Sequence, residues 1–246
     1  MEKIKVAAII QARRGSTRLP DKVFLELSNK PLLEHVVNRL KKSDLLQEII
    51  IATTDLPDDN LIQTWANSNN ISVFRGSENN VLERYYEAAK KYQIDVIVRI
   101  TADDPFKDYR LVDEAVRVLI DNKLDFVCNN NPVSFPEGLD VEVLTFNALE
   151  VSYNNVISDF DKEHVTQYIH KNKDKFNIAN IQNEKDLSFH RWTLDTIEDY
   201  QFAQKIYSEL YKEGYVFLRE EVLELLEKSP LILELNNKVN RSDLYR

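Results

Sequence analysis

The sequence predicts an α/β fold in which a mostly parallel sheet is covered by helices on both faces. Short, continuous apolar runs alternate with amphipathic helical patterns through the first two-thirds of the chain. Strands that are apolar on both sides are typical of parallel sheets packed between two layers of helices. The length of 246 residues suits one domain. We therefore expect a single domain over residues 1–246.

The first half of the chain supplies most of the predicted sheet. The apolar run at 6–10 predicts a buried strand, and Pro31 with the leucine and valine spacing after it predicts a helix over 31–40. The same alternation predicts strands at 49–52, 71–74 and 95–100 and a strand opening at 126, with helices at about 58–68, 81–89 and 111–119.

The alternation changes after residue 129. NNNPVSFPEG predicts a loop, and the alternating GLDVEVLTF predicts an exposed strand. Helices are expected at about 147–156 and 160–171, RWTLDT is expected to return to the core as a strand, and helices at 197–212 and 219–228 close the chain. We therefore expect an inserted hairpin and helical segment at about 130–185, on the main sheet rather than in a second domain.

Composition argues against several classes of protein. The chain carries 32 Lys and Arg against 41 Asp and Glu, a net charge of −9, which disfavours nucleic acid or an anionic membrane as partner. The single cysteine, Cys128, fits a reducing cytoplasm, and with four scattered histidines it argues against a zinc site. No apolar run approaches the 18 residues of a membrane span, and the first is too short for a signal peptide. We expect a cytoplasmic protein.

The segment QARRGSTRLPDK, residues 11–22, concentrates basic and small residues directly after the first predicted strand. The basic residues are Arg13, Arg14, Arg18 and Lys22, and Gly15, Ser16 and Thr17 lie between them. Small residues let backbone N–H groups approach a ligand, and Arg and Lys supply the charge that a polyphosphate needs. The alternative is a solvated basic loop. The segment is neither a Walker A loop nor a GxGxxG motif.

Two aspartates follow predicted strands. Asp103 comes after the strand at 95–100, and Asp195 ends RWTLD. Carboxyl ends of parallel strands share one edge of the sheet, where ligands bind. Two carboxylates that converge on a triphosphate can hold Mg²⁺. The alternative is that either aspartate caps the next helix, although Asp108 and Thr196 could do so instead.

AIIQARRGSTRLPDKVF resembles the opening of the SpsF-like branch of the cytidylyltransferase family, which also contains the CMP-KDO and CMP-sialic acid synthetases. The resemblance continues in order through IIIATTDLPDDN, VFRGSENNVLERYYEAA, VRITADDP, FPEGLDVEVLTFNALE, KEHVTQYI and RWTLDTIED, over about residues 4–228. It implies a Rossmann-like nucleotide-diphospho-sugar transferase fold and a homodimer. It also implies Mg²⁺-dependent transfer of CMP from CTP to a small-molecule acceptor, with release of pyrophosphate.

The basic loop, the two aspartates and the resemblance together give a candidate site. Catalytic candidates are Arg13, Lys22, Asp103 and Asp195, and the last two are the Mg²⁺ ligands. Nucleotide-binding candidates are Ala12, Arg13, Gly15, Ser16, Thr17, Arg18, Lys22, Arg75, Thr101 and Asp103. Acceptor-binding candidates are Arg84, Asp140, Glu142, His164 and Arg191.

Each acceptor candidate also has a structural alternative. Arg84 could pair with Glu87 on a solvated helix face. The acidic cluster of Glu137, Asp140 and Glu142 around Gly138 could hold sugar hydroxyls or an amine, or could be the polar face of a strand. Histidines such as His164 more often pack than act in catalysis.

The sequence departs from the family pattern at three positions. Ala102 stands where the family often has glycine, Asp104 where it has a small or neutral residue, and Ile197 where proline is common. Two other functions remain open: a glycosyltransferase that uses a nucleotide-diphospho-sugar, with TADDP as its metal motif, and a nucleotide-binding regulator without chemistry. The acceptor is not apparent from the residues, and the choice of CTP depends on the resemblance.

Overall fold

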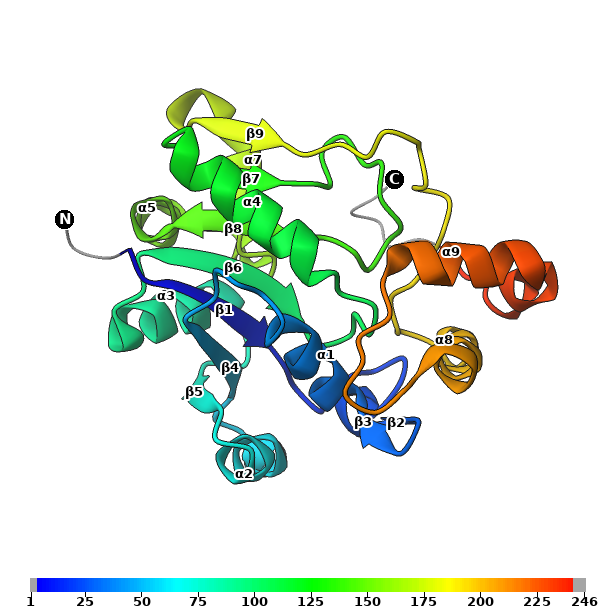
Figure 1. Cartoon of the computed structure of the whole chain (residues 1–246). Coiled ribbons are helices and arrows are strands. Elements are labelled where there is room, and N and C mark those ends of the chain that lie inside the picture. Colours follow the sequence, from blue (N-terminus) through cyan, green and yellow to red (C-terminus); the bar gives the residue numbers. More distant parts are fainter. Residues whose placement is uncertain (1–3, 241–246) are drawn as a thin grey trace.

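The computed structural model describes residues 4–240 and contains a seven-stranded mixed sheet in the order β5-β4-β1-β6-β8-β7-β9 (Figure 1). The strands are β1 (Val6–Gln11), β4 (Glu48–Thr54), β5 (Ser72–Gly76), β6 (Val96–Thr101), β7 (Phe126–Cys128), β8 (Glu142–Thr145) and β9 (Ile178–Asn180). β1 pairs in parallel with β4 and β6, whereas β8 runs antiparallel to both β6 and β7. The predicted α/β fold with a mostly parallel sheet is confirmed.

Helices cover both faces of this sheet. They are α1 (Leu32–Leu40), α2 (Asn60–Ser68), α3 (Val81–Tyr92), α4 (Tyr109–Asp121), α5 (Phe146–Asn155), α6 (Asp159–Glu163), α7 (Gln167–Lys171), α8 (Ile197–Leu210) and α9 (Arg219–Lys228). Ala8 and Ile10 of β1 enter the core beneath α1, α4 and α8, and Ala7 and Ile9 enter the core beneath α3 and α5. Side chains of a strand alternate between faces, so β1 must be apolar throughout.

Short elements connect the main ones. The 3-10 helix η1 (Lys22–Phe24) and the small hairpin of β2 (Glu26–Leu27) and β3 (Lys30–Pro31) lie between β1 and α1. Further 3-10 turns are η2 (Pro57–Asp59), η3 (Lys173–Lys175) and η4 (Pro230–Leu235). The hairpin and β9 were not predicted, because runs of two or three residues carry no periodicity.

The strand predicted as exposed in GLDVEVLTF is in fact buried. β8 lies between β6 and β7, with Val143 in one core and Leu144 in the other. Its polar position, Glu142, is buried because Arg99 of β6 neutralises it. The segment at 130–185 thus supplies β8 and β9 to the main sheet.

Two other predicted elements differ in the structure. RWTLDT forms no strand; its backbone makes an isolated bridge between Arg191 and Glu137, while Trp192 and Leu194 are buried in the core. The helix predicted over 160–171 is two helices, α6 and α7, because the backbone turns at Val165, which has a φ of 46°.

Candidate active site

The basic loop meets the two aspartates at one edge of the sheet. It follows β1 and ends at Lys22, and Asp103 follows the neighbouring strand β6. The Lys22 Nζ donates to Asp103 Oδ2 at 2.6 Å and to Asp195 Oδ1 at 2.8 Å. The backbone N–H of Leu194 donates to the Asp103 carbonyl at 2.9 Å. Residues far apart in the sequence therefore converge on one ammonium group.

The charges of this cluster support one another. Burial alone would lower the pKa of Lys22, but the charges of Asp103 and Asp195 raise it above its ordinary value. Burial likewise opposes ionisation of Asp103, but the Lys22 charge and hydrogen bond hold its pKa well below the usual range. Arg18 and Arg191 contact Asp195 at 3.0 and 3.1 Å. Lys22 and Asp103 are therefore both charged at neutral pH.

The two aspartates fit Mg²⁺ only together with other ligands. The carboxylates of Asp103 and Asp195 both contact the Lys22 Nζ. One bound cation could therefore contact both carboxylates. Between residues 4 and 240 no group of three His, Cys, Asp or Glu side chains could hold a metal ion. Mg²⁺ is often held by one or two carboxylates plus substrate phosphates. The donor set therefore fits a metal that arrives with a nucleotide rather than one held by protein alone.

The capping alternative does not apply to these aspartates. Asp108 accepts from the backbone N–H of Arg110 at the start of α4. Thr196 forms a capping box with Asp199 at the start of α8. Both helices are capped by other residues, which leaves Asp103 and Asp195 to the cluster around Lys22.

Two adjoining cavities open beside the cluster. The first, of about 290 Å³, we call the basic cavity; it is lined by Gln11, Ala12, Arg13, Ser16, Thr17, Arg18, Lys22, Val23, Val81, Arg84, Thr101, Ala102, Asp103, Glu163, His164 and Asp195. The second, of about 210 Å³, we call the acidic cavity; it is lined by Gln11, Arg18, Arg99, Thr101, Asp103, Asp104, Asn130, Glu137, Gly138, Asp140, Glu142, His164, Thr193 and Asp195. The shared residues include both aspartates, so the cavities meet at the predicted metal ligands.

The structure separates the remaining nucleotide and acceptor candidates. Arg84 is 2% exposed and donates to the carbonyls of Ser77 and Glu78, not to Glu87, and it lines the basic cavity. Arg75 donates to the backbone carbonyls of Thr54 and Leu56 and lines neither cavity.

Two more candidates lie beside the site rather than facing it. Gly15 is in the loop but lines neither cavity. Arg191 lies behind Asp195, where it is buried and paired with Glu137 and Asp199. It therefore positions Asp195 and does not face either cavity.

Burial lowers the pKa of His164, which lines both cavities, so its ring is neutral at pH 7.

Two carboxylates of the acidic cavity pair with basic side chains. Glu142 accepts from Arg99 at 2.5 Å, and although burial opposes ionisation, the Arg99 charge holds the pKa of Glu142 at about 2. Asp104 accepts from Lys107 at 2.8 Å, and burial raises its pKa to about 6. Asp104 therefore pairs with Lys107 and is not a third partner of Lys22.

Several lining residues were not among the candidates. Gln11, Arg99, Asn130 and Thr193 were missed. Arg99 could have been found, because it is the charged residue inside an otherwise apolar strand. The others have no local pattern that marks them.

A Rossmann-like α/β sheet with a basic loop after β1, facing one carboxylate after β6 and a second just before α8, is typical of nucleotide-binding enzymes. The model of the family described as cytidylyltransferase matches residues 7–239, and the chain belongs to that family. This confirms the family resemblance found in the sequence.

Full-length relatives agree with this assignment. The chain is 41% identical over 247 residues to an uncharacterized protein of Methanocaldococcus jannaschii, covering 99% of this chain and 98% of the relative. It is 32% identical over 229 residues to the spore coat polysaccharide biosynthesis protein SpsF of Bacillus subtilis, covering 90% and 94%.

Solved structures share the fold. A cytidylyltransferase of Leptospira borgpetersenii superposes with a TM-score of 0.90 at 34% identity, covering 98% of this chain and 100% of that chain. A CMP-KDO synthetase in complex with CTP gives a TM-score of 0.65 at 16% identity, with 84% and 100% covered, which shows the fold alone. Within the described residues, every helix is too short or too polar to cross a bilayer.

Proposed function

We propose that the chain is an Mg²⁺-dependent, CTP-using cytidylyltransferase. It transfers CMP to a sugar, a sugar acid or a small phosphorylated acceptor and releases pyrophosphate, in the synthesis of precursors for surface polysaccharides or other glycoconjugates. The observation that carries the proposal is the Lys22 Nζ between Asp103 and Asp195 in the wall of the basic cavity. The name of the Bacillus subtilis relative supports the polysaccharide context.

In this proposal the acceptor oxygen attacks the α-phosphorus of CTP, and the bond to the pyrophosphate oxygen breaks. Arg13, Arg18 and Lys22 bind the phosphates and stabilise the charge on the transition state and on the leaving pyrophosphate. Backbone N–H groups around Ser16 and Thr17 cradle the phosphates. Lys22 exchanges its two carboxylate partners for phosphate oxygens. Mg²⁺ held by Asp103 and Asp195 supplies charge neutralisation on the phosphates.

We propose that the acceptor binds in the acidic cavity, which meets the basic cavity at both aspartates. Polar groups of Asp140, Glu142 and His164 line it and can hydrogen-bond the hydroxyls of a sugar. A cytoplasmic location and a homodimer are also part of the proposal. The first rests on the single cysteine and the second on the family resemblance.

Pyrophosphate release tests the reaction. The protein is incubated with Mg²⁺, CTP and a panel of sugars, sugar acids and phosphorylated small molecules. One acceptor should give release that is lost without Mg²⁺, and Lys22→Ala should lower turnover roughly 10²-fold. Near-normal turnover of Lys22→Ala would refute the role of this lysine. Consumption of a nucleotide-diphospho-sugar without pyrophosphate would identify a glycosyltransferase, and CTP binding without turnover of any acceptor would favour a regulator.

A further inference from the structure

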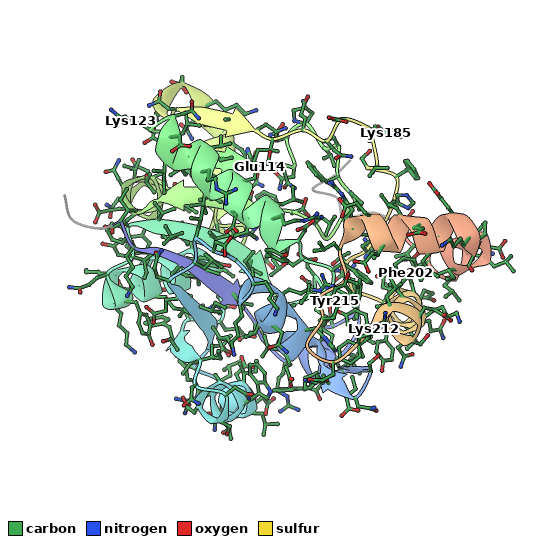
Figure 2. The ribbon with its side chains drawn as sticks, in the orientation of Figure 1. Glu114, Lys123, Lys185, Phe202, Lys212 and Tyr215 are labelled. Atoms are coloured by element: carbon green, nitrogen blue, oxygen red, sulfur yellow. The ribbon has the colours of Figure 1, made fainter. Side chains whose placement is uncertain are left out.

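A third cavity, of about 380 Å³, shares no lining residue with the basic and acidic cavities. It lies between α1, which supplies His35 and Arg39, and the end of α8 with the loop that leads to α9. Figure 2 labels Tyr215 on that loop, beside α1. We call it the α1–α8 cavity. Its size suits a small molecule.

Arg39 gives this cavity a buried positive charge. The side chain is 3% exposed, and its Nη1 donates to the carbonyls of Phe217 at 3.0 Å and Lys107 at 3.3 Å. Its guanidinium lies 4.5 Å from the centre of the Phe217 ring. Over residues 4–240, no carboxylate forms an ion pair with it. A buried charge without an opposite charge is costly, and an anion in the cavity relieves that cost.

Further basic residues surround Arg39. Lys41 and Lys42 extend from the end of α1 and are exposed, and neither forms an ion pair within the described part of the chain. Lys30 also lines the cavity and is paired with Glu34 and Glu213 at its rim. Lys41 and Lys42 also stabilise α1 through their interaction with the helix dipole at its C-terminus. That interaction does not explain why Arg39 is buried without a carboxylate partner among the described residues. The cavity is thus locally basic in a chain whose net charge is −9.

The walls of the cavity are aromatic. Tyr207, Tyr211 and Phe217 line it, and the Tyr207 and Phe217 rings meet edge to face with centroids 5.0 Å apart. The His35 ring packs against Tyr207 and Tyr211, with centroids 4.4 and 5.5 Å away. Its Nε2 lies 2.6 Å from the Leu27 carbonyl oxygen. Planar walls beside a guanidinium suit a ligand that joins a phosphate to a planar group.

The back wall of the cavity touches the segment that carries the predicted metal ligand. The Tyr207 hydroxyl donates to the Pro105 carbonyl at 2.6 Å, and Arg39 donates to the Lys107 carbonyl. Asp103 lies two residues before Pro105, and Lys107 pairs with Asp104. A ligand that holds Arg39 and Tyr207 therefore also restrains residues 103–107.

We propose that the α1–α8 cavity binds a small phosphomonoester with a planar organic group, and that its occupancy restrains the Asp103–Lys107 segment. The phosphate pairs with Arg39, Lys41 and Lys42, and the planar group lies against Tyr207, Tyr211 and Phe217. This site is separate from the proposed reaction, and its test requires no turnover.

Binding is tested with phenyl phosphate as the probe and phenol as the uncharged control, followed by ligand-observed NMR. Wild-type protein should bind phenyl phosphate and not phenol, and added salt should weaken binding. A double variant, Lys41→Glu with Lys42→Glu, should raise the Kd roughly tenfold or more through loss and reversal of charge. The control is Lys123→Glu, which reverses the charge of one exposed lysine just after the C-terminus of α4, labelled in Figure 2. This variant should leave the Kd unchanged.

Arg39→Gln is a second variant, and it should abolish binding of phenyl phosphate. If Arg39→Gln does not fold, the double lysine variant still tests the proposal. Absence of phenyl phosphate binding, or a Kd unchanged in the double variant, would overturn the proposal. Binding that survives the double variant but is lost in Arg13→Ala would place the phosphate in the basic cavity instead.

Hydrogen–deuterium exchange tests the second half of the proposal. Phenyl phosphate should slow exchange of backbone amides in the segment 103–108 of the wild type and not of the double variant. Unchanged exchange at saturating phenyl phosphate would show that the site is not connected to that segment, and would overturn this half.

Discussion

Replacement of Lys22 by methionine removes the cation between two converging carboxylates. The side chains of Lys22, Asp103 and Asp195 are only 14%, 24% and 11% exposed, so solvent screens the remaining repulsion poorly. Breaking a buried ion pair costs about 3–5 kcal/mol. Asp195 keeps Arg18 at 3.0 Å and Arg191 at 3.1 Å, whereas Asp103 has no second ion pair within residues 4–240. We therefore expect the lower end of that range, about 3 kcal/mol.

For a chain of this size, that loss corresponds to a Tm roughly 6–12 °C lower in the absence of divalent ions. Mg²⁺ should then raise the Tm of Lys22→Met more than that of the wild type, because the lysine no longer competes for the two carboxylates. The assay is a thermal melt in EDTA and in a Mg²⁺ series, with the exposed lysine variant Lys123→Met as the matched control. A Lys22→Met protein that melts within about 2 °C of the wild type and responds equally to Mg²⁺ would refute the reasoning.

Three further changes test other parts of the structure. Gly138 has a φ of 100°, and a Cβ there would lie 2.7 Å from the Thr193 backbone nitrogen. Gly138→Ala should therefore lower the free energy of unfolding, measured in urea, by about 3 kcal/mol or more. A decrease of less than about 1 kcal/mol would contradict this expectation. The pKa of Glu142 is about 2, below its ordinary value of 4.5. This shift stabilises the folded state by about 3 kcal/mol above pH 4.5, and the stabilisation is lost as the pH falls toward 2. Glu142→Gln, which removes the partner of Arg99, should therefore lower stability at neutral pH and flatten its loss in acid; an unchanged acid dependence would argue against the ion pair. Burial raises the pKa of the Cys128 thiol to about 12, so a thiol reagent should label it only after unfolding, and rapid labelling of the native protein would contradict its burial.

The sheet and its main helices were predictable because their signals are local. A continuous apolar run such as that of β1 can be satisfied only between two layers of helices. The position of β8 was not predictable in this way. Glu142 breaks the apolar pattern, so the segment looks half-exposed, and the group that allows its burial is Arg99, which lies 43 residues away in the sequence.

The same distinction applies to the candidate site. The loop at residues 11–22 and Asp103 each follow a recognisable strand, so their meeting at the edge of the sheet could be predicted. Arg75 at the end of β5 and Arg84 in the first turn of α3 could not be separated by sequence, because no local pattern shows which of the two side chains faces the site. Three-dimensional contacts direct Arg75 onto backbone carbonyls away from the cavities and place Arg84 in the wall of the basic cavity.

Calorimetric titration of nucleotides in the presence of Mg²⁺ tests whether the protein binds CTP through Mg²⁺ and Asp103. Wild-type protein is titrated with CTP, UTP, GTP and ATP and with UDP-, dTDP-, GDP- and CDP-sugars, and Asp103→Asn is titrated in parallel. We expect CTP to bind most tightly, and we expect this binding to be lost with EDTA and strongly weakened in Asp103→Asn. Binding of a diphospho-sugar without binding of any free triphosphate, or CTP binding that is indifferent to both Mg²⁺ and Asp103, would contradict it.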